Sequence, residues 1–133
     1  MKKLFFASFF LLGLAAGVFA QSQNPKVIAL INKASWCPVC QANGPRFEKD
    51  IMPMVMNNTD VKMVMNDLSN DQTKTASADM LEKAGVAKFA KKNTATGVLY
   101  FLDPTSKKLI SKISISKTDE EIKQALQSAL SKG

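Results

Sequence analysis

Residues 35–40, Ser-Trp-Cys-Pro-Val-Cys, hold the only two cysteines of this 133-residue chain and separate them by two residues. They follow residues 27–31, Val-Ile-Ala-Leu-Ile, an apolar run with three β-branched members that is typical of a strand buried on both faces. After Cys40 the apolar residues repeat every three or four positions, which indicates a helix. The sequence therefore predicts a dithiol where a buried strand leads into a helix.

The start of the predicted helix is a place where a thiol becomes acidic. Pro38 suits the first turn, because its missing N–H would have no partner there. The unpaired N–H groups of that turn and the positive end of the helix dipole both stabilise a thiolate. Cysteines in such places have pKa values of roughly 3.5 to 7.5, against about 8.5 for a free thiol. We therefore expect Cys37 to be the acidic and exposed cysteine, and Cys40 to attack any mixed disulfide formed at Cys37.

Two other uses of the cysteine pair stay open. A structural disulfide is one, although a bridge across two residues closes a very small loop and constrains the unfolded chain little. A Cu(I)-binding or copper-delivery module is the other, because thiolates and thioethers suit this ion. The nearby thioethers are Met52, Met54, Met56, Met63 and Met65, for which the pattern favours the ordinary role of apolar core residues. A redox dithiol is the favoured function, and the lack of histidine excludes Cys/His and Ser/His/Asp catalysis.

The segment around the cysteines resembles the active site of the thioredoxin-like superfamily. Residues 34–40 match it, and Pro45, eight residues after the first cysteine, stands where the family has a helix-bending proline. Residues 96–104 resemble the family's third core strand and the turn after it. The resemblance implies a thiol-disulfide oxidoreductase in which Cys37 attacks a substrate and Cys40 resolves the mixed disulfide.

The resemblance also implies a surface for an extended substrate polypeptide. Its members are Trp36, Pro38, Val39, Thr96 and Gly97. Trp36 stands beside the attacking thiol, whereas Thr96 and Gly97 are expected opposite the dithiol.

Three positions depart from the family's pattern. Ile31 stands where thioredoxin has a buried aspartate that moves protons for the second cysteine, so that Lys33, Glu48 or water must take this role. Gly97 stands where the family has a cis-proline, whose ring covers the sulfurs. The pair between the cysteines is Pro-Val in place of thioredoxin's Gly-Pro, and this pair tunes the redox poise.

The remaining pattern predicts an α/β fold of the order βαβαββα, with helices on both faces of a four-stranded mixed sheet. This is the minimal thioredoxin-like arrangement. Residues 67–75 are polar and predict a loop. Strands are expected at residues 27–31, 61–65, 98–102 and 108–115. The first helix is expected at residues 38–57, bent near Pro45 and bent or ended near Pro53, and the second at residues 77–93, interrupted by Gly85. The third is expected at residues 118–130 and begins with a capping box of Thr118 and Glu121.

The first 20 residues predict a secretory signal peptide. Lys2 and Lys3 precede an apolar run at residues 4–19, and Ala20 ends a small-residue cleavage site. An uncleaved membrane anchor is the alternative, but a span needs about 20 apolar residues. Cleavage after Ala20 leaves one thioredoxin-like domain at residues 21–133, exported to a bacterial periplasm.

The expected partners follow from export and from the dithiol. Substrates are cysteine-containing exported proteins, and a membrane-bound or soluble thiol-disulfide partner recycles the dithiol. We expect a monomer without cofactor or resident metal. The net charge of +7 comes from lysines scattered along the chain and a single arginine, Arg46, so that nucleic-acid binding is not indicated.

Overall fold

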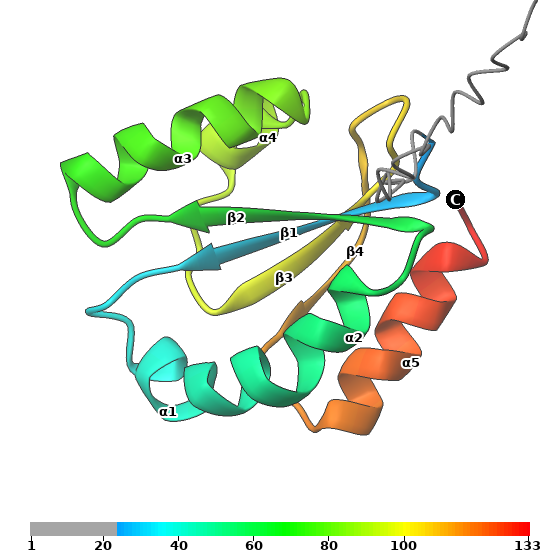
Figure 1. Cartoon of the computed structure of the whole chain (residues 1–133), viewed down its shortest axis with the longest axis horizontal. Coiled ribbons are helices and arrows are strands. Elements are labelled where there is room, and N and C mark those ends of the chain that lie inside the picture. The colour runs from blue at the N-terminus through cyan, green and yellow to red at the C-terminus, as the bar shows by residue number, and fades with distance from the viewer. Residues whose placement is uncertain (1–23) are drawn as a thin grey trace, which may run out of the picture.

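The computed structural model describes residues 24–133, and the predicted signal peptide lies outside these residues. Four strands form one mixed sheet, in which β1 pairs in parallel with β2 and antiparallel with β3. β4 completes the order β2-β1-β3-β4 as the antiparallel neighbour of β3 (Figure 1). The strands are β1 (Val27–Lys33), β2 (Val61–Asp67), β3 (Val98–Leu102) and β4 (Leu109–Ser114), so the predicted four-stranded mixed sheet is confirmed.

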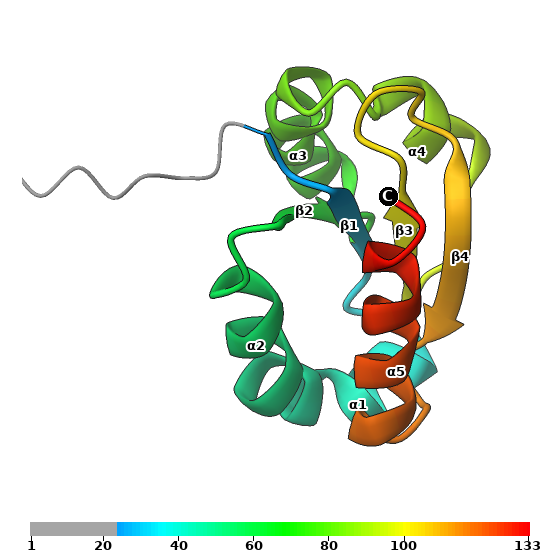
Figure 2. The same ribbon diagram turned by 90° about the vertical axis from the view of Figure 1, so that its right-hand side faces the viewer.

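Helices cover both faces of the sheet, as predicted (Figures 1 and 2). Because strand side chains alternate in direction, each face has its own apolar core. Ile31 and Phe101 pack toward one core and Leu30 and Tyr100 toward the other. The first face carries α1 (Pro38–Arg46), the π-helical segment η1 (Phe47–Ile51), α2 (Met52–Met56) and α5 (Asp119–Leu130), and the second carries α3 (Asp71–Lys83) and α4 (Ala87–Lys92).

The helix predicted at residues 38–57 is one helical run with a wider turn in its middle. Pro45 lies inside α1, as expected. In η1 the N–H of Met52 donates to the carbonyl of Phe47, five residues back, in place of the usual four. Pro53 has no N–H to donate to the carbonyl of Lys49, so the wide turn ends where a regular helical bond would be missing anyway.

The predicted loop at residues 67–75 is wrong at both ends, because β2 includes Asp67 and α3 begins at Asp71. The side chain of Asn70 accepts a hydrogen bond from the N–H of Thr73 at 3.0 Å, and Thr73 Oγ1 accepts one from the N–H of Asn70 at 3.1 Å. This reciprocal cap starts a helix that needs few apolar residues, since only Ser77 and Leu81 of α3 are buried. Polar composition alone therefore misled the sequence-based prediction.

The other two predicted helical features agree with the structure. Gly85, at φ +71°, separates α3 from α4. Thr118 and Glu121 form the expected capping box at the start of α5. Within residues 24–133 no helix has the length and apolar character that crossing a membrane requires.

Candidate active site

Cys37 and Cys40 lie where β1 has ended and α1 begins, as the sequence predicts. Cys37 is the N-cap residue of α1, and its Sγ accepts a hydrogen bond from the N–H of Cys40 at 3.2 Å. Pro38 occupies the first turn. The structure describes both cysteines as free thiols. A sulfur that already accepts a helix N–H is well placed to carry negative charge.

The expectation that Cys37 is exposed is wrong, because the residue is only 2% exposed while Cys40 is half-buried. Gly97 and Val39 close over it. A Cβ placed on Gly97 would lie 3.6 Å from the Sγ of Cys37 and 2.7 Å from the Cγ1 of Val39. A side chain at Gly97 would therefore contact the attacking sulfur and clash with Val39.

The two thiols have opposite pKa shifts. Burial of Cys37 raises its pKa, but hydrogen bonds from the Cys40 side chain, the Thr96 side chain and the N–H groups of Cys40 and Val39 outweigh it, and the net pKa is lowered. Burial also raises the pKa of Cys40, and the hydrogen bond to Cys37 together with the nearby negative charge adds to this effect. The prediction that Cys37 is the more acidic thiol agrees with these directions.

The structure brings most of the predicted substrate-binding residues to the dithiol. Trp36 is 59% exposed and Pro38 is also exposed, so both present their side chains to solvent. Val39 and Thr96 are half-buried, whereas Gly97 is buried. Val39, Thr96 and Gly97 lie at the Cys37 sulfur, and Trp36 and Pro38 flank Cys37 in the chain. Their contact with a substrate remains a prediction.

Gly97 lies opposite the dithiol as predicted, but its backbone differs from a cis-proline. No peptide bond between residues 24 and 133 is cis. The φ of Gly97 is +71°, a left-handed conformation that favours glycine. Its N–H donates to the carbonyl of Asn32 at 2.8 Å, which proline could not do. The left-handed conformation favours glycine at this position, and the hydrogen bond excludes proline.

Asn32 and Asn66 hold the segment before Gly97, and the sequence analysis did not identify them. Asn32 is fully buried and donates to the carbonyls of Asn93 and Ala95 at 2.6 and 3.2 Å. Asn66 donates to the Oδ1 of Asn32 at 2.9 Å. The two asparagines are partners in the β1–β2 register, and the signal in the sequence is an asparagine at the end of each apolar strand.

Arg46 connects α1 to the opposite wall of the site. Its guanidinium pairs with the carboxylate of Asp119 and donates to the carbonyls of Ile115 and Lys117 at 2.5 and 2.9 Å. The N–H of Ile115 in turn donates to the carbonyl of Gly97 at 2.9 Å. The only arginine of the chain therefore fixes the helix that carries the cysteines against the segment that covers them.

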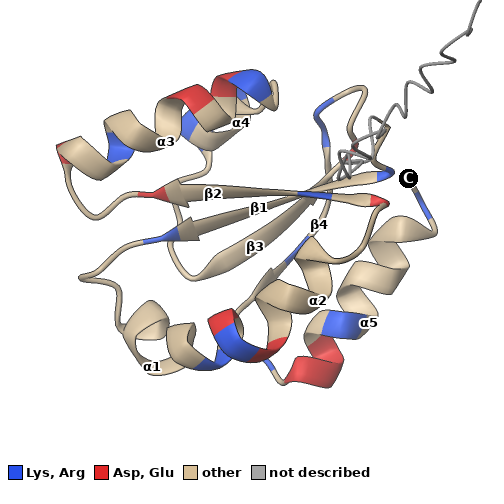
Figure 3. Cartoon of the chain, in the orientation of Figure 1, with Lys and Arg blue, Asp and Glu red and all other residues tan. Residues whose placement is uncertain are grey.

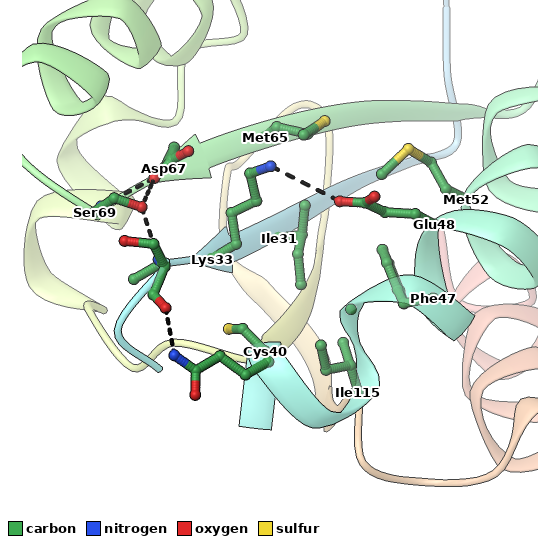
Figure 4. A pocket seen from close by; sticks show the side chains of 14 residues that line it. Ile31, Lys33, Cys40, Phe47, Glu48, Met52, Met65, Asp67, Ser69 and Ile115 are labelled. Atoms are coloured by element: carbon green, nitrogen blue, oxygen red, sulfur yellow. Dashed lines mark hydrogen bonds and ion pairs between the residues drawn. The ribbon is translucent and has the colours of Figure 1, made fainter. Parts of the chain in front are cut away.

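A pocket of about 220 Å³ lies on the other side of the dithiol and has Cys40 in its wall; we call it the Cys40 pocket (Figure 4). Lys33 Nζ and Glu48 Oε1 lie 3.9 Å apart beside it. These two predicted proton-transfer candidates thus share a pocket with Cys40. The pocket's apolar lining consists of Ile31, Ala34, Phe47, Met52, Met65 and Ile115, so Ile31 does face the second cysteine's surroundings in place of an acid.

Four of the five methionines named above lie in the core or at the pocket, whereas Met56 is 62% exposed, so its interpretation as a core residue is wrong. Met54 and Met63 pack against the core, as expected if they are core residues and not metal ligands. Met52 and Met65 also contact that core but line the Cys40 pocket as well. Residues 24–133 contain no group of three or more histidine, cysteine, aspartate or glutamate side chains that could hold a metal ion.

No protein-family model and no curated protein matches the sequence. Solved structures do match. A thioredoxin from Wuchereria bancrofti is 17% identical, with 82% of this chain and 85% of that chain covered and a TM-score of 0.52. A candidate protein disulfide isomerase from Bacteroides thetaiotaomicron is 22% identical (81% and 76% covered, TM-score 0.52). StoA from Bacillus subtilis is 18% identical (76% and 82% covered, TM-score 0.50).

These similarities show that the chain has the thioredoxin-like fold. The predicted fold class is thereby confirmed. Within this fold, the close pair of Cys37 and Cys40 is consistent with thiol-disulfide exchange.

Proposed function

We propose that this protein is a thiol-disulfide oxidoreductase that uses Cys37 and Cys40 on cysteine-containing polypeptides. One observation carries the proposal. The Sγ of Cys37 caps α1 and has a lowered pKa, while Cys40, which donates to it, has a raised pKa. This is the division of labour that exchange requires, since one thiol must react as a thiolate and the other must keep its proton until it is needed.

Reduction of a substrate takes two displacements. The Cys37 thiolate attacks one sulfur of the substrate disulfide, which forms a mixed disulfide and releases one substrate thiolate. Cys40 then loses its proton and attacks the Sγ of Cys37. This forms the Cys37–Cys40 disulfide and releases the second substrate thiolate, so that two electrons pass to the substrate and the thiolates take up two protons. Oxidation of a substrate dithiol is the reverse sequence.

The proton of Cys40 has a route to solvent through the Cys40 pocket. Lys33 and Glu48 stand at this pocket, and both are at least one-third exposed. Water in the pocket can therefore accept the proton without a buried acid, which suits the presence of Ile31 where the resembled family has aspartate.

The surface around the dithiol suits an uncharged stretch of substrate. Residues 35–45 contain no charged side chain, and the first turns of α1 carry neither blue nor red in Figure 3. An extended polypeptide near its cysteine would lie on Trp36, Pro38 and Val39 and against the backbone of Thr96 and Gly97. The substrates would be exported proteins, the protein would act as a monomer, and a membrane-bound or soluble thiol-disulfide partner would recycle it.

Export is part of this proposal and has a direct test. Cleavage after Ala20 gives a mature chain that begins at Gln21. Intact-mass measurement of the protein from the secreted or periplasmic fraction should give the mass of residues 21–133. The full-length mass in a membrane fraction would support an uncleaved anchor.

Cu(I) binding is the second candidate function, and the position of Met52 and Met65 favours it. These thioethers line the same pocket as Cys40, and thioether and thiolate ligands suit Cu(I). A binding module would hold about one Cu(I) and exchange disulfides slowly, whereas an oxidoreductase turns over without metal. Insulin reduction in the presence of a Cu(I) chelator separates the two functions.

Replacing each cysteine tests the oxidoreductase. In Cys37→Ser the rate of insulin reduction should fall by about 10³-fold or more, because no attacking thiolate remains. Cys40→Ser should still attack and should accumulate mixed disulfides, detectable by mass spectrometry. Unchanged turnover in Cys37→Ser, with a fold confirmed by circular dichroism, would contradict the proposal.

A further inference from the structure

The Cys40 pocket has the size, the wall and the rim of a binding site for a side chain. Its apolar floor includes Ile31, Phe47 and Met65, and Cys40 forms part of its wall. An apolar cavity of about 150 Å³ is enough to hold a benzene ring, so about 220 Å³ is enough for one large apolar side chain. The pocket is open to the surface beside the dithiol, so it is accessible to a bound molecule.

The helix that forms one wall is shaped to leave room. Phe47 and Glu48 line the pocket from η1, the wide helical turn, and such turns often occur at functional sites. Gly44, also in the wall, has no atom within 4 Å of the place that its Cβ would occupy. A glycine inside a helix costs about 0.5–1 kcal/mol relative to alanine. Glycine relieves the crowding before Pro45, and it also leaves this wall bare.

The rim of the pocket carries polar groups in fixed positions (Figure 4). Lys33 pairs with Glu48 on one side. On the other side Ser69 Oγ accepts a hydrogen bond from the N–H of Ser35 at 2.8 Å, and the Ser69 N–H donates to Asp67 at 2.9 Å. Apolar floors with a few well-placed polar groups at the rim are typical of ligand pockets.

We propose that the Cys40 pocket binds a large apolar side chain of the substrate polypeptide, one to three residues from the reacting cysteine. This deepens the proposed function and rests on it. Cys40 lines the pocket and its N–H lies 3.2 Å from the Sγ of Cys37, so a chain joined to that sulfur has the pocket within reach of its next side chains. The rim can bind the peptide groups on either side, through Lys33 as donor and Glu48 or Asp67 as acceptor. This surface is separate from the one that Trp36 and Gly97 border.

The preference for a large apolar side chain near the reacting cysteine is measured with two disulfide-linked peptides. They differ only in having leucine or alanine two residues after the cysteine. The wild type should reduce the leucine peptide about 10-fold faster in kcat/KM, because the alanine peptide leaves the pocket unfilled. Gly44→Leu should fill the pocket from within and lower the preference to about 2-fold or less. Ala42→Leu is the matched control, since Ala42 is exposed on the same helix and outside the pocket, and it should keep the preference.

The outcomes separate this inference from the proposed function. Equal rates for the two peptides in the wild type would overturn the pocket inference even if Gly44→Leu failed to fold. A full preference in a folded Gly44→Leu would also overturn it. If the wild type reduces neither peptide nor a small aromatic disulfide, the oxidoreductase itself is wrong.

Discussion

On one side of the dithiol the backbone of Gly97 lies against Cys37, and on the other side Cys40 borders an open pocket. The Gly97 side is held by buried Asn32, whose amide donates two hydrogen bonds and accepts one, whereas the pocket side has an exposed ion pair. The comparison shows what each thiol needs. A thiolate requires donors that do not move, while a thiol that must release its proton requires access to water.

The largest difference in stability between the two sides of the dithiol is expected when Gly97 and Gly44 are each replaced by alanine. Gly97→Ala places a Cβ at positive φ and 2.7 Å from Val39, so we expect a loss of about 2–4 kcal/mol in the free energy of unfolding. Gly44→Ala meets no atom within 4 Å and should change this free energy by less than about 1 kcal/mol. Urea unfolding of both reduced variants measures the difference.

A second substitution sharpens this test. Val39→Ala in the Gly97→Ala background removes the clash with the Val39 Cγ1 and should recover part of the lost stability, leaving the 3.0 Å approach to the Cβ of residue 39 and the penalty of the left-handed backbone. Equal losses at Gly97 and Gly44 would mean that the two sides do not differ in packing.

Removal of the buried amide should loosen the Gly97 side without touching the pocket. Asn32→Ala leaves the Asn66 amide and the carbonyls of Asn93 and Ala95 without their partner, which should cost about 2–3 kcal/mol. It should also slow exchange, because the segment that carries Thr96 is no longer fixed. Urea unfolding and the rate of insulin reduction measure both effects. Asn93→Ala is the control, since it keeps the carbonyl that Asn32 binds and loses only the hydrogen bond from its own amide to the Phe89 carbonyl.

The pH dependence of alkylation should distinguish the two thiols themselves. Cys37 has the lowered pKa and should react with iodoacetamide at a lower pH than a free thiol, and Cys40 at a higher pH. Mass mapping of the label across the pH range measures this order. Predominant labelling of Cys40 near neutral pH would reverse the assigned roles, and its greater exposure makes this a demanding test.

The same shifts fix the sign of the stability change with pH in the reduced protein. The folded pKa of Cys37 lies below its unfolded value, so its contribution is complete above about pH 8.5 and is lost as the pH falls through the folded pKa. Cys40 acts in the opposite sense, since its contribution is present below the unfolded pKa and is lost as the pH rises through the raised one. Relative to Cys37→Ser, the reduced wild type should therefore gain stability toward neutral and mildly alkaline pH.

The smallest effect is expected at the rim of the pocket. Lys33→Met removes an ion pair whose side chains are 36% and 58% exposed, so the free energy of unfolding should change by less than about 0.5 kcal/mol. Burial raises the pKa of Asp67, but the Ser69 hydrogen bonds and the charge of Lys33 lower it below its usual value, so this pKa should rise in the variant. Titration of Asp67 by NMR measures the shift, and a large loss of stability would show that the rim is part of the core.

The sequence contains local signals for the strands and for the dithiol, and these were predictable. The five apolar residues of 27–31 and the Cys-x-x-Cys spacing need no knowledge of distant contacts. The burial of Cys37 depends on Gly97, and the bond from Asn32 to Asn93 joins residues 61 positions apart. Such contacts exist only in the folded chain. The pocket was likewise unpredictable, since its walls come from β1, η1, β2 and the segment after β4.

The sulfur that caps α1 also links electron transfer to the folding of this helix. A thiolate is a better acceptor for the N–H of Cys40 than a disulfide sulfur, so oxidation weakens the cap. In a thermodynamic cycle, a contact that stabilises the reduced form more than the oxidised form makes the disulfide a stronger oxidant by the same free energy. The cap of α1 thus favours the reduced dithiol, and a more stable α1 would make the Cys37–Cys40 disulfide a still stronger oxidant.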